Sequence, residues 1–323
     1  MVGAIIQTKI FSYIIPSMKI TLPDGSVRKL EAGANGFDLA NNIGPGLAKA
    51  AIAVSVNGIQ KDLCDPINED SEVSIITIDS DEGLEIMRHT LAAQVLARAV
   101  KNLYPDTKLA IGPTIKDGFY YDFEFVKPIA PDDLDKIEKE MLKIINSKSS
   151  ITKKLHSKKD ALNVFNSIGE SYKESIIDES EQEDNFQLYY QENDEFVDLC
   201  RGPHLPSLKH IGAFKLTKLA GAYRNGESKN KMLTRIYGTA WKNEKDLNTY
   251  LNSLEEAEKR DHRKIGKEMN LFHFQEEAPG MVFWHPNGWT VYRILQNFMR
   301  NKLEAFDYQE INTPLVVDRK LWE

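Results

Sequence analysis

The residues MKITLPDGSVRKL at positions 18–30 decide how the first part of the chain folds. Polar and apolar residues alternate on both sides of the PDGS turn signal, which is typical of two strands joined by a tight turn. Further on, residues 37–43 have apolar side chains at helical spacing, and Ile52–Val56 alternates into the hairpin signal Asn57-Gly58. With a last strand at Val73–Ile78, the pattern predicts a small mixed sheet with one helix, a β-grasp or ubiquitin-like module.

Composition limits what the whole chain can be. It has 323 residues, a formal net charge of −7 and 41% hydrophobic residues, which predicts a globular protein of two or more domains. No apolar run approaches the ~20 residues that span a bilayer, and two distant cysteines exclude a disulfide scaffold. Residues 1–17 carry one lysine and lack a cleavage site, so we expect an N-terminal extension, or a start at Met18, rather than a secretory signal. A cytoplasmic protein with no membrane partner is predicted.

Residues 80–242 mix helical and strand patterns and predict a second, α+β domain. Apolar periodicity predicts helices over residues 84–103 and 132–147. The acidic stretch 178–198 is interpreted as a solvated hairpin. The fold class is therefore a multidomain α+β protein.

The last third predicts a connector followed by the beginning of another domain. Residues 243–270 form one leucine stripe without proline and predict a long helix. An amphipathic helix over 289–303 and a strand over 308–317 that carries Pro314 follow. The domain that begins at residue 271 is expected to be incomplete.

One compact constellation could carry chemistry, the run Asp198-Leu-Cys200-Arg-Gly-Pro-His204. Its Gly-Pro pair prevents a helix, so Cys200 and His204 are expected to meet across a tight turn. A thiol beside an imidazole can bind a metal or orient a water. A buried thiol beside a hydrogen-bonded histidine is the alternative. His89, with Ala93 four residues later, has no second histidine on its helix face.

Seven segments in one order resemble bacterial threonyl-tRNA synthetase. They are RHTLAAQVLARAV (88–100), AIGPTIKDGFYYDFEF (110–125), GESYKESIIDE (169–179), VDLCRGPH (197–204), NKMLTRIYGTAW (230–241), KRDHRKIGK (259–267) and EEAPGMVFWHPNGW (276–289). The resemblance implies an extension, a TGS domain, an editing domain shared with alanyl-tRNA synthetases, a linker helix and a truncated class II catalytic domain ending in motif 1. Their ranges are 1–17, 18–79, 80–242, 243–270 and 271–323.

The same resemblance implies an activity. The family attaches threonine to its tRNA using ATP, and this part would hydrolyse seryl-tRNA that was charged in error. A pocket for threonine rejects serine, which is smaller by one methyl group, by only about 1–3 kcal/mol, so a second, hydrolytic site is needed. The motifs that bind ATP and zinc in the family are not in this sequence, so we expect no cofactor here and no aminoacylation by this chain alone. ATP, magnesium and zinc are expected for the full-length enzyme. Implied partners are the tRNA for threonine and a second copy bound through motif 1.

The resemblance also assigns roles to individual residues. His89 and His204 would position the water or ribose hydroxyls, and Cys200 would form a pocket wall. Lys173 would stabilise negative charge or contact the ribose, while Tyr121 and Asp198 would hold the amino group and the adenosine. We therefore expect His89, Lys173, Asp198, Cys200 and His204 to be catalytic, Tyr121 to bind substrate, and no metal to be held.

Two departures from the family pattern leave a second interpretation open. The second histidine of the family's HxxxH pair falls on Ala93, or on Gln94 if this helix holds one extra residue, and Thr90 then takes the first position. The segment 223–226 lacks the family's usual tryptophan. The alternative function is a non-catalytic tRNA-binding and dimerisation fragment. Its RNA contacts would use the basic stretches 148–159 and 259–267, unless these are solvated helix faces.

Overall fold

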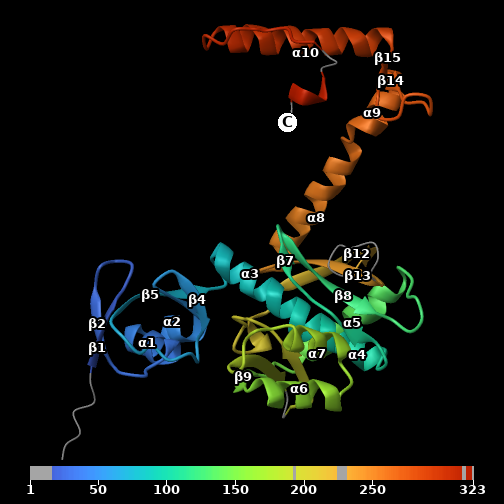
Figure 1. Cartoon of the computed structure of the whole chain (residues 1–323). Helices are drawn as coiled ribbons and strands as arrows, with labels where there is room; N and C mark the ends of the chain where they lie inside the picture. Colours follow the sequence, from blue (N-terminus) through green and yellow to red (C-terminus); the bar gives the residue numbers. More distant parts are fainter. Residues whose placement is uncertain (1–16, 192–193, 224–230, 315–317, 322–323) are drawn as a thin grey trace, which may run out of the picture. The chain divides into compact units, whose positions relative to one another are not determined.

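The computed structural model describes residues 17–191, 194–223, 231–314 and 318–321. The expected extension, apart from Ser17, and residues 224–226 lie outside these ranges. The chain forms two compact units, Met1–Asn248 and Thr249–Glu323, which we describe separately. Figure 1 shows their elements in chain order. No helix in the described ranges is long and apolar enough to cross a membrane.

The first module of unit 1 is the expected β-grasp. Its mixed sheet has the order β2-β1-β5-β3-β4, with β1 and β5 parallel and the other pairs antiparallel. Asn57 and Gly58 have φ values of 51° and 82°, which is the conformation that a two-residue hairpin turn requires. The elements are β1 (Ser17–Thr21), β2 (Val27–Glu31), α1 (Gly36–Ile43), α2 (Pro45–Ala50), β3 (Ala51–Val56), β4 (Ile59–Asp62) and β5 (Ser71–Thr77).

Local signals at α1 explain why the helix starts where it does. The Asn35 side chain accepts the backbone N–H groups of Phe37 and Asp38, and the Asp38 carboxylate accepts the Asn35 N–H, forming a capping box. Leu39 and Ala40 then pack against the apolar face of the sheet. The β-grasp core is thus built from residues close in sequence.

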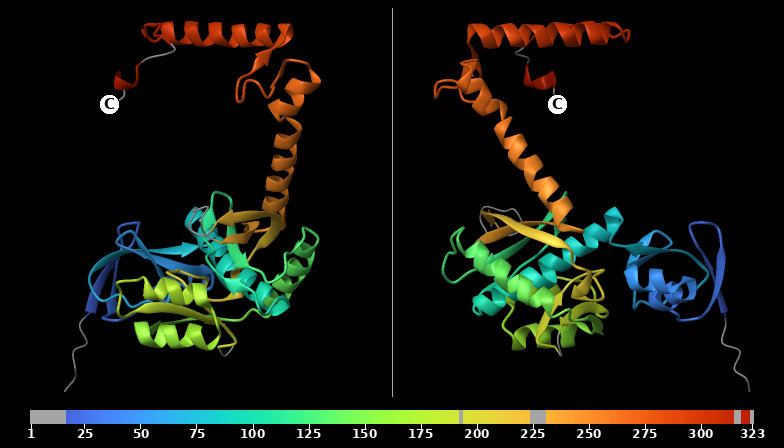
Figure 2. Two further views of the ribbon diagram at one scale, coloured as in Figure 1. Left: turned by 45° about the vertical axis from the view of Figure 1, so that its right-hand side comes forward. Right: turned by 180° about the vertical axis from the view of Figure 1, so that it is seen from behind.

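The second domain centres on a long helix that lies across an antiparallel sheet (Figures 1 and 2). The helix runs through α3 (Asp81–Thr90), a π-helical segment (Leu91–Leu96) and α4 (Ala97–Leu103). The sheet has the order β12-β13-β8-β6, with β7 paired to β8. Its members are β6 (Lys108–Leu109), β7 (Thr114–Ile115), β8 (Gly118–Glu124), β12 (Ala213–Tyr223) and β13 (Met232–Trp241), and α5 (Asp133–Asn146) packs beside the long helix.

The π-helical segment lies inside the predicted helix 84–103. Ala97 donates its backbone N–H to the carbonyl oxygen of Ala92, five residues back. The side chain of Gln191 on the neighbouring strand donates to the Gln94 carbonyl oxygen at 2.6 Å and to its amide oxygen at 2.9 Å. The irregular turn is therefore stabilised by a glutamine from another element.

A three-stranded sheet of order β11-β10-β9 completes the second domain. The interpretation of residues 178–198 as a solvated hairpin is wrong, because Phe186, Leu188 and Tyr190 of β10 pack into a core with helix α6. Asp198 is itself buried within β11, and the acidic run 179–184 precedes β10, so charge composition alone gave the wrong exposure. The elements are β9 (Ile151–His156), α6 (Lys158–Ser167), α7 (Ser171–Asp178), β10 (Phe186–Gln191), β11 (Phe196–Leu199) and a 3₁₀ turn (Leu208–His210).

The C-terminal region departs from two predictions. The single helix expected over 243–270 is interrupted, because Asp261 leaves the helical conformation and caps α9 by accepting the Arg263 N–H. Residues 308–314 form no strand; a strand needs a hydrogen-bonded neighbour, and none lies beside them in the described ranges. The elements are α8 (Glu244–Lys259), which crosses the unit boundary, α9 (His262–Glu268), β14 (Phe272–His273), β15 (Phe283–Trp284), α10 (Pro286–Glu304) and a 3₁₀ turn (Arg319–Leu321).

Candidate functional site

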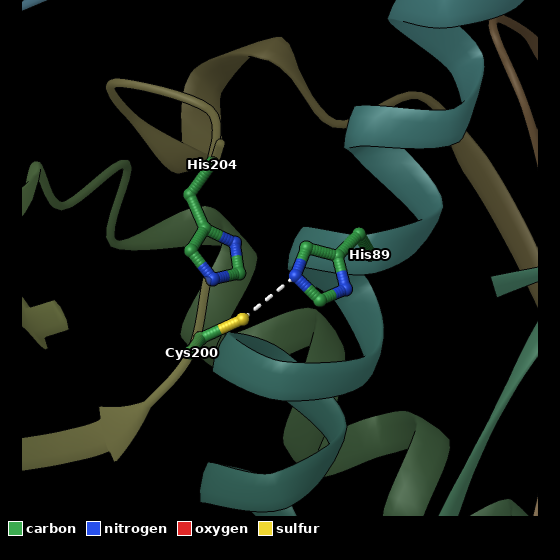
Figure 3. A group of neighbouring side chains, drawn as sticks. All are labelled: His89, Cys200 and His204. Carbon is green, nitrogen blue, oxygen red and sulfur yellow. Dashed lines mark hydrogen bonds between the residues drawn. The ribbon is translucent and has the colours of Figure 1, made fainter. Parts of the chain in front are cut away.

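Three predicted site residues meet beside helix α3 (Figure 3). His89 projects from α3, while Cys200 and His204 come from the loop after β11. The Nε2 atom of His89 lies 2.8 Å from the Cys200 sulfur, and the two imidazole rings stack with centroids 4.6 Å apart. Cys200 and His204 therefore meet across the Gly-Pro turn, as the sequence predicts.

The charge state of His89 follows from its surroundings. Its Nε2 contact with Cys200 can run in either direction, because an imidazole nitrogen donates or accepts according to the tautomer. Burial lowers the pKa of His89, against the opposing effect of Asp198. Burial therefore favours the neutral form of His89.

His204 has one nitrogen bound and one free. The Thr90 hydroxyl donates its single proton to the Ile86 carbonyl oxygen at 2.8 Å, so its contact with His204 Nδ1 at 3.1 Å must be an acceptance. The Nδ1 atom therefore carries the ring proton, and Nε2 has a lone pair. His204 is 2% exposed, and its Nε2 has no hydrogen-bond partner among the described residues. Such a nitrogen can accept a proton from a water or a substrate hydroxyl.

The other three predicted residues form a second polar cluster, and all of them are almost fully buried. The Lys173 ammonium lies 2.6 Å from Asp198 Oδ1, and the Tyr121 hydroxyl donates to Asp198 Oδ2 at 3.3 Å. Burial raises the pKa of Asp198 and raises that of Tyr121 well above its usual value, while Lys173 opposes the shift at Asp198. These side chains bind one another at the end of β11, two residues before Cys200 in the chain.

Ala93 and Gln94 are the two candidate positions of the family's second histidine. Among the described residues, neither side chain makes a hydrogen bond to His89, Cys200 or His204. Ala93 is buried and apolar, and the Gln94 side chain turns to Gln191 on β10. The Gln94 oxygens accept from Gln191, while its Nε2 has no hydrogen-bond partner among the described residues. Thr90, by contrast, takes part in the site, and the sequence signal for it is the alternative alignment that puts it at the first histidine position.

A cavity of about 250 Å³ opens beside His89. Its lining includes Pro113, Gly202 and Pro203. Glu85, one helical turn before His89, is the acidic residue of this lining. Gln60 of the β-grasp module also lines it. The cavity could hold a small group with a positive charge next to the His89 imidazole ring.

The three ligand atoms of His89, Cys200 and His204 lie within 4.8 Å of one another, so we tested whether they fit a zinc ion. Zinc bonds of about 2.0–2.1 Å to nitrogen and 2.3 Å to sulfur in a tetrahedral arrangement separate the two ligand atoms by roughly 3.5 Å. The observed 2.8 Å between His89 Nε2 and the sulfur is shorter than this. The pair matches a direct hydrogen bond better than two ligands of one ion, and we derive no step through a metal.

Two family models match the chain. Residues 18–77 match the TGS domain, which is the β-grasp module. Residues 187–237 match the threonyl and alanyl tRNA synthetase second additional domain and include Asp198, Cys200 and His204. The fold and the site thus define a protein of the aminoacyl-tRNA synthetase class with a TGS domain and an editing-type domain.

Curated relatives agree with this class. The chain is 53% identical over 304 residues to the threonine–tRNA ligase of Hahella chejuensis. The aligned region covers 94% of this chain and 47% of that protein. The enzymes of Rhodospirillum rubrum and Prochlorococcus marinus are 52% and 51% identical, with the same shares covered. Over 94% of its length the chain is therefore similar to threonine–tRNA ligases, which confirms the resemblance. It spans about half the length of the relatives it matches.

Proposed function

We propose that this chain carries the hydrolytic editing site of a threonyl-tRNA synthetase and removes serine from tRNA charged in error. The observation that supports this most directly is the buried, unpartnered Nε2 of His204, whose ring stacks on that of His89, a residue that lines the cavity of about 250 Å³. Ester hydrolysis needs a base at this kind of position, whereas a purely structural histidine has both nitrogens bound.

In the proposed reaction, a water attacks the carbonyl carbon of the seryl ester while His204 Nε2 accepts one of its protons. The ring then carries protons on both nitrogens, and Thr90 stabilises the imidazolium because it already accepts the Nδ1 proton. When the tetrahedral intermediate collapses, the ester bond breaks and the same proton passes from Nε2 to the departing ribose oxygen. The products are serine and an uncharged tRNA, and no covalent enzyme intermediate forms.

The seryl group is placed in the cavity beside His89. The amino group of an aminoacyl ester is cationic at neutral pH, and Glu85 is the acidic group of the lining. The prolines on both sides of the cavity have rigid rings and restrict its width, which suits a site that excludes threonine by its extra methyl group.

The cluster of Lys173, Asp198 and Tyr121 has a supporting role in this proposal. Its side chains are bound to one another and almost fully buried, so we assign them to hold the end of β11 rather than to contact the substrate. Cys200 lies 2.8 Å from His89 Nε2, and we assign it to hold that ring in place. It is not proposed as a nucleophile.

The remaining proposals rest on the family. Helices α8 and α9 would act as the linker, and the residues from 271 onward would begin a class II catalytic domain that binds a second copy. Transfer RNA for threonine would be the partner and the cytoplasm the location. ATP, magnesium and zinc would be needed by the whole enzyme for aminoacylation, which this chain would not perform alone.

The test is to mix the purified chain with seryl- and threonyl-tRNA for threonine and follow the loss of each ester. We expect rapid loss of serine with threonine retained, and a reduction of kcat by about 10²–10⁴-fold in His204→Ala. His262→Ala is the matched control, because that ring is 87% exposed on α9. Full activity of His204→Ala would contradict the mechanism.

The second candidate function is a tRNA-binding and dimerisation module without hydrolysis. Ala93, at the position of the missing histidine, is the observation that favours it. Bound tRNA with no ester loss above the protein-free control would support this candidate over editing.

A further inference from the structure

Asp62 lies at the end of β4 in the TGS domain, yet the hydrogen bonds of its carboxylate go to the second domain. Its carboxylate accepts the His204 backbone N–H at 2.9 Å on Oδ1, and the Tyr189 hydroxyl at 2.7 Å and the Lys153 ammonium at 2.9 Å on Oδ2. The residue is 7% exposed. A buried carboxylate with three donors is strongly bound in place.

Each of these contacts bears on the position of His204. The Tyr189 ring meets the His204 ring edge-on with centroids 4.4 Å apart. Burial and Asp62 raise the pKa of Tyr189, so its hydroxyl remains a donor. A Cβ atom on Gly202 would lie 1.9 Å from the Tyr189 hydroxyl oxygen and 3.2 Å from Asp62 Oδ2, so the Cys200–His204 loop packs directly on the carboxylate.

The surroundings leave His204 room to move if these contacts are lost. A cavity of about 230 Å³ lies next to it and is lined by residues of both domains, including Asp62, Tyr189 and Leu205. A displacement of about 1 Å at a reacting group can reduce a rate by about 10²-fold. Fixing this histidine therefore needs the groups that Asp62 supplies.

We propose that Asp62 is a positioning residue for His204, so that the TGS domain completes the hydrolytic site of its neighbour. The catalytic part of this inference rests on the proposed editing function. The contact between Asp62 and the second domain does not depend on that function.

Asp65 provides a matched control. Its carboxylate also binds the Lys153 ammonium and accepts the Asp62 backbone N–H at 3.1 Å, but among the described residues it makes no hydrogen bond to His204 or Tyr189. Asp62→Asn and Asp65→Asn each remove one charge from the same ion-pair network at nearly constant volume. Only Asp62→Asn changes the acceptor that faces His204.

The first measurement is kcat and KM for loss of serine from seryl-tRNA, using the full 323-residue chain. For Asp62→Asn we expect kcat to fall by about 10- to 100-fold with KM within about twofold, because binding groups are untouched. Asp65→Asn should change both constants by less than about twofold. Equal kcat values in the two variants would overturn the proposal.

The second measurement does not depend on activity. Histidine ring signals are recorded by ¹H–¹⁵N NMR, with His204 assigned by its loss in His204→Gln. They should shift in Asp62→Asn and stay in place in Asp65→Asn. If the wild-type chain hydrolyses nothing, the editing function fails while this shift still tests the contact. Unmoved His204 signals in Asp62→Asn would refute the positioning role.

A third variant covers the case in which Asp62→Asn does not fold. Tyr189→Phe leaves the Asp62 carboxylate paired with Lys153. It removes only the Tyr189 hydroxyl, which connects this carboxylate to the aromatic ring that packs against His204. We expect a several-fold lower kcat and a smaller shift of the His204 signals. A variant identical to wild type in both readouts would overturn the proposal.

Discussion

The two buried polar clusters of the second domain differ in one respect, which is how completely their atoms are bound. Asp198 accepts from Lys173 at 2.6 Å, from the Leu199 N–H at 2.9 Å and from Tyr121 at 3.3 Å. In the other cluster, His204 Nε2 has no partner among the described residues. Asp198 and His204 are equally buried, so burial alone does not distinguish these two residues. In the Asp198 cluster, which we call saturated, the polar groups bind one another and can stabilise the fold. In the His204 cluster, which we call unsaturated, one ring nitrogen remains free to accept a proton.

Removing the cation of the saturated cluster should have the largest effect on folding. Lys173→Met leaves Asp198 buried and unpaired, and we expect the free energy of unfolding to fall by about 3–5 kcal/mol in urea titrations. The control is Lys154→Met, which breaks an exposed pair with Asp194 and should cost less than about 1 kcal/mol. Similar costs for the two variants would show that the cluster does not support the fold.

Thr90→Val tests the unsaturated cluster. It removes the acceptor for the His204 Nδ1 proton, and a hydrogen bond to a group that becomes charged contributes about 1.5–3 kcal/mol. We expect kcat for serine release to fall by about 10- to 100-fold. Thr90→Ser keeps the hydroxyl and should retain most of the rate. If valine and serine behave alike, Thr90 does not set the state of the ring.

The pH dependence of stability should reveal His89. Its folded-state pKa is lowered by burial, so the unfolded chain binds more protons below about pH 6.5 and stability is lost as the pH falls. One such group contributes up to about 1.4 kcal/mol per pH unit in this window. Urea titrations between pH 5 and pH 8 should show a smaller decline in His89→Gln than in wild type. Parallel curves would contradict the neutral ring.

Tyr121→Phe is expected to have the smallest effect. The Asp198 carboxylate keeps Lys173 and the Leu199 N–H, and it loses only the longest of its three hydrogen bonds. A cost of about 0.5–1.5 kcal/mol in the free energy of unfolding is expected, with serine release within a few-fold of wild type. A large loss of kcat at unchanged stability would instead place Tyr121 in contact with the substrate.

The β-grasp module could be predicted because its signals are local. Alternation sets the face of each strand, and Asn57-Gly58 adopts the two positive φ angles that its hairpin needs. The same reasoning failed for the acidic hairpin, where tertiary packing buries β10. It also missed the interruption at Asp261, a single capping residue within a helical pattern.

The site was predictable in its residues but not in its bonding. Motifs identify His89, Cys200 and His204, and the structure brings them together. Thr90 and Asp62 act on His204 across 114 and 142 residues of sequence, and no local pattern indicates such contacts. Which nitrogen is free depends on these partners.

The π-helical turn has a consequence for how this helix tolerates a change in length. A single residue added to an α-helix rotates everything beyond it by about 100°. Because Leu91–Leu96 absorbs such a rotation, His89 can face the Cys200 loop while Arg98 still reaches Gln191 and Glu195 on the other sheet. Deleting one residue from this segment would rotate Arg98 relative to His89, so that the two side chains could no longer reach their partners at the same time. We therefore expect that related proteins with the π-helical segment also have a glutamine at the position of Gln191, and that those without the segment lack it.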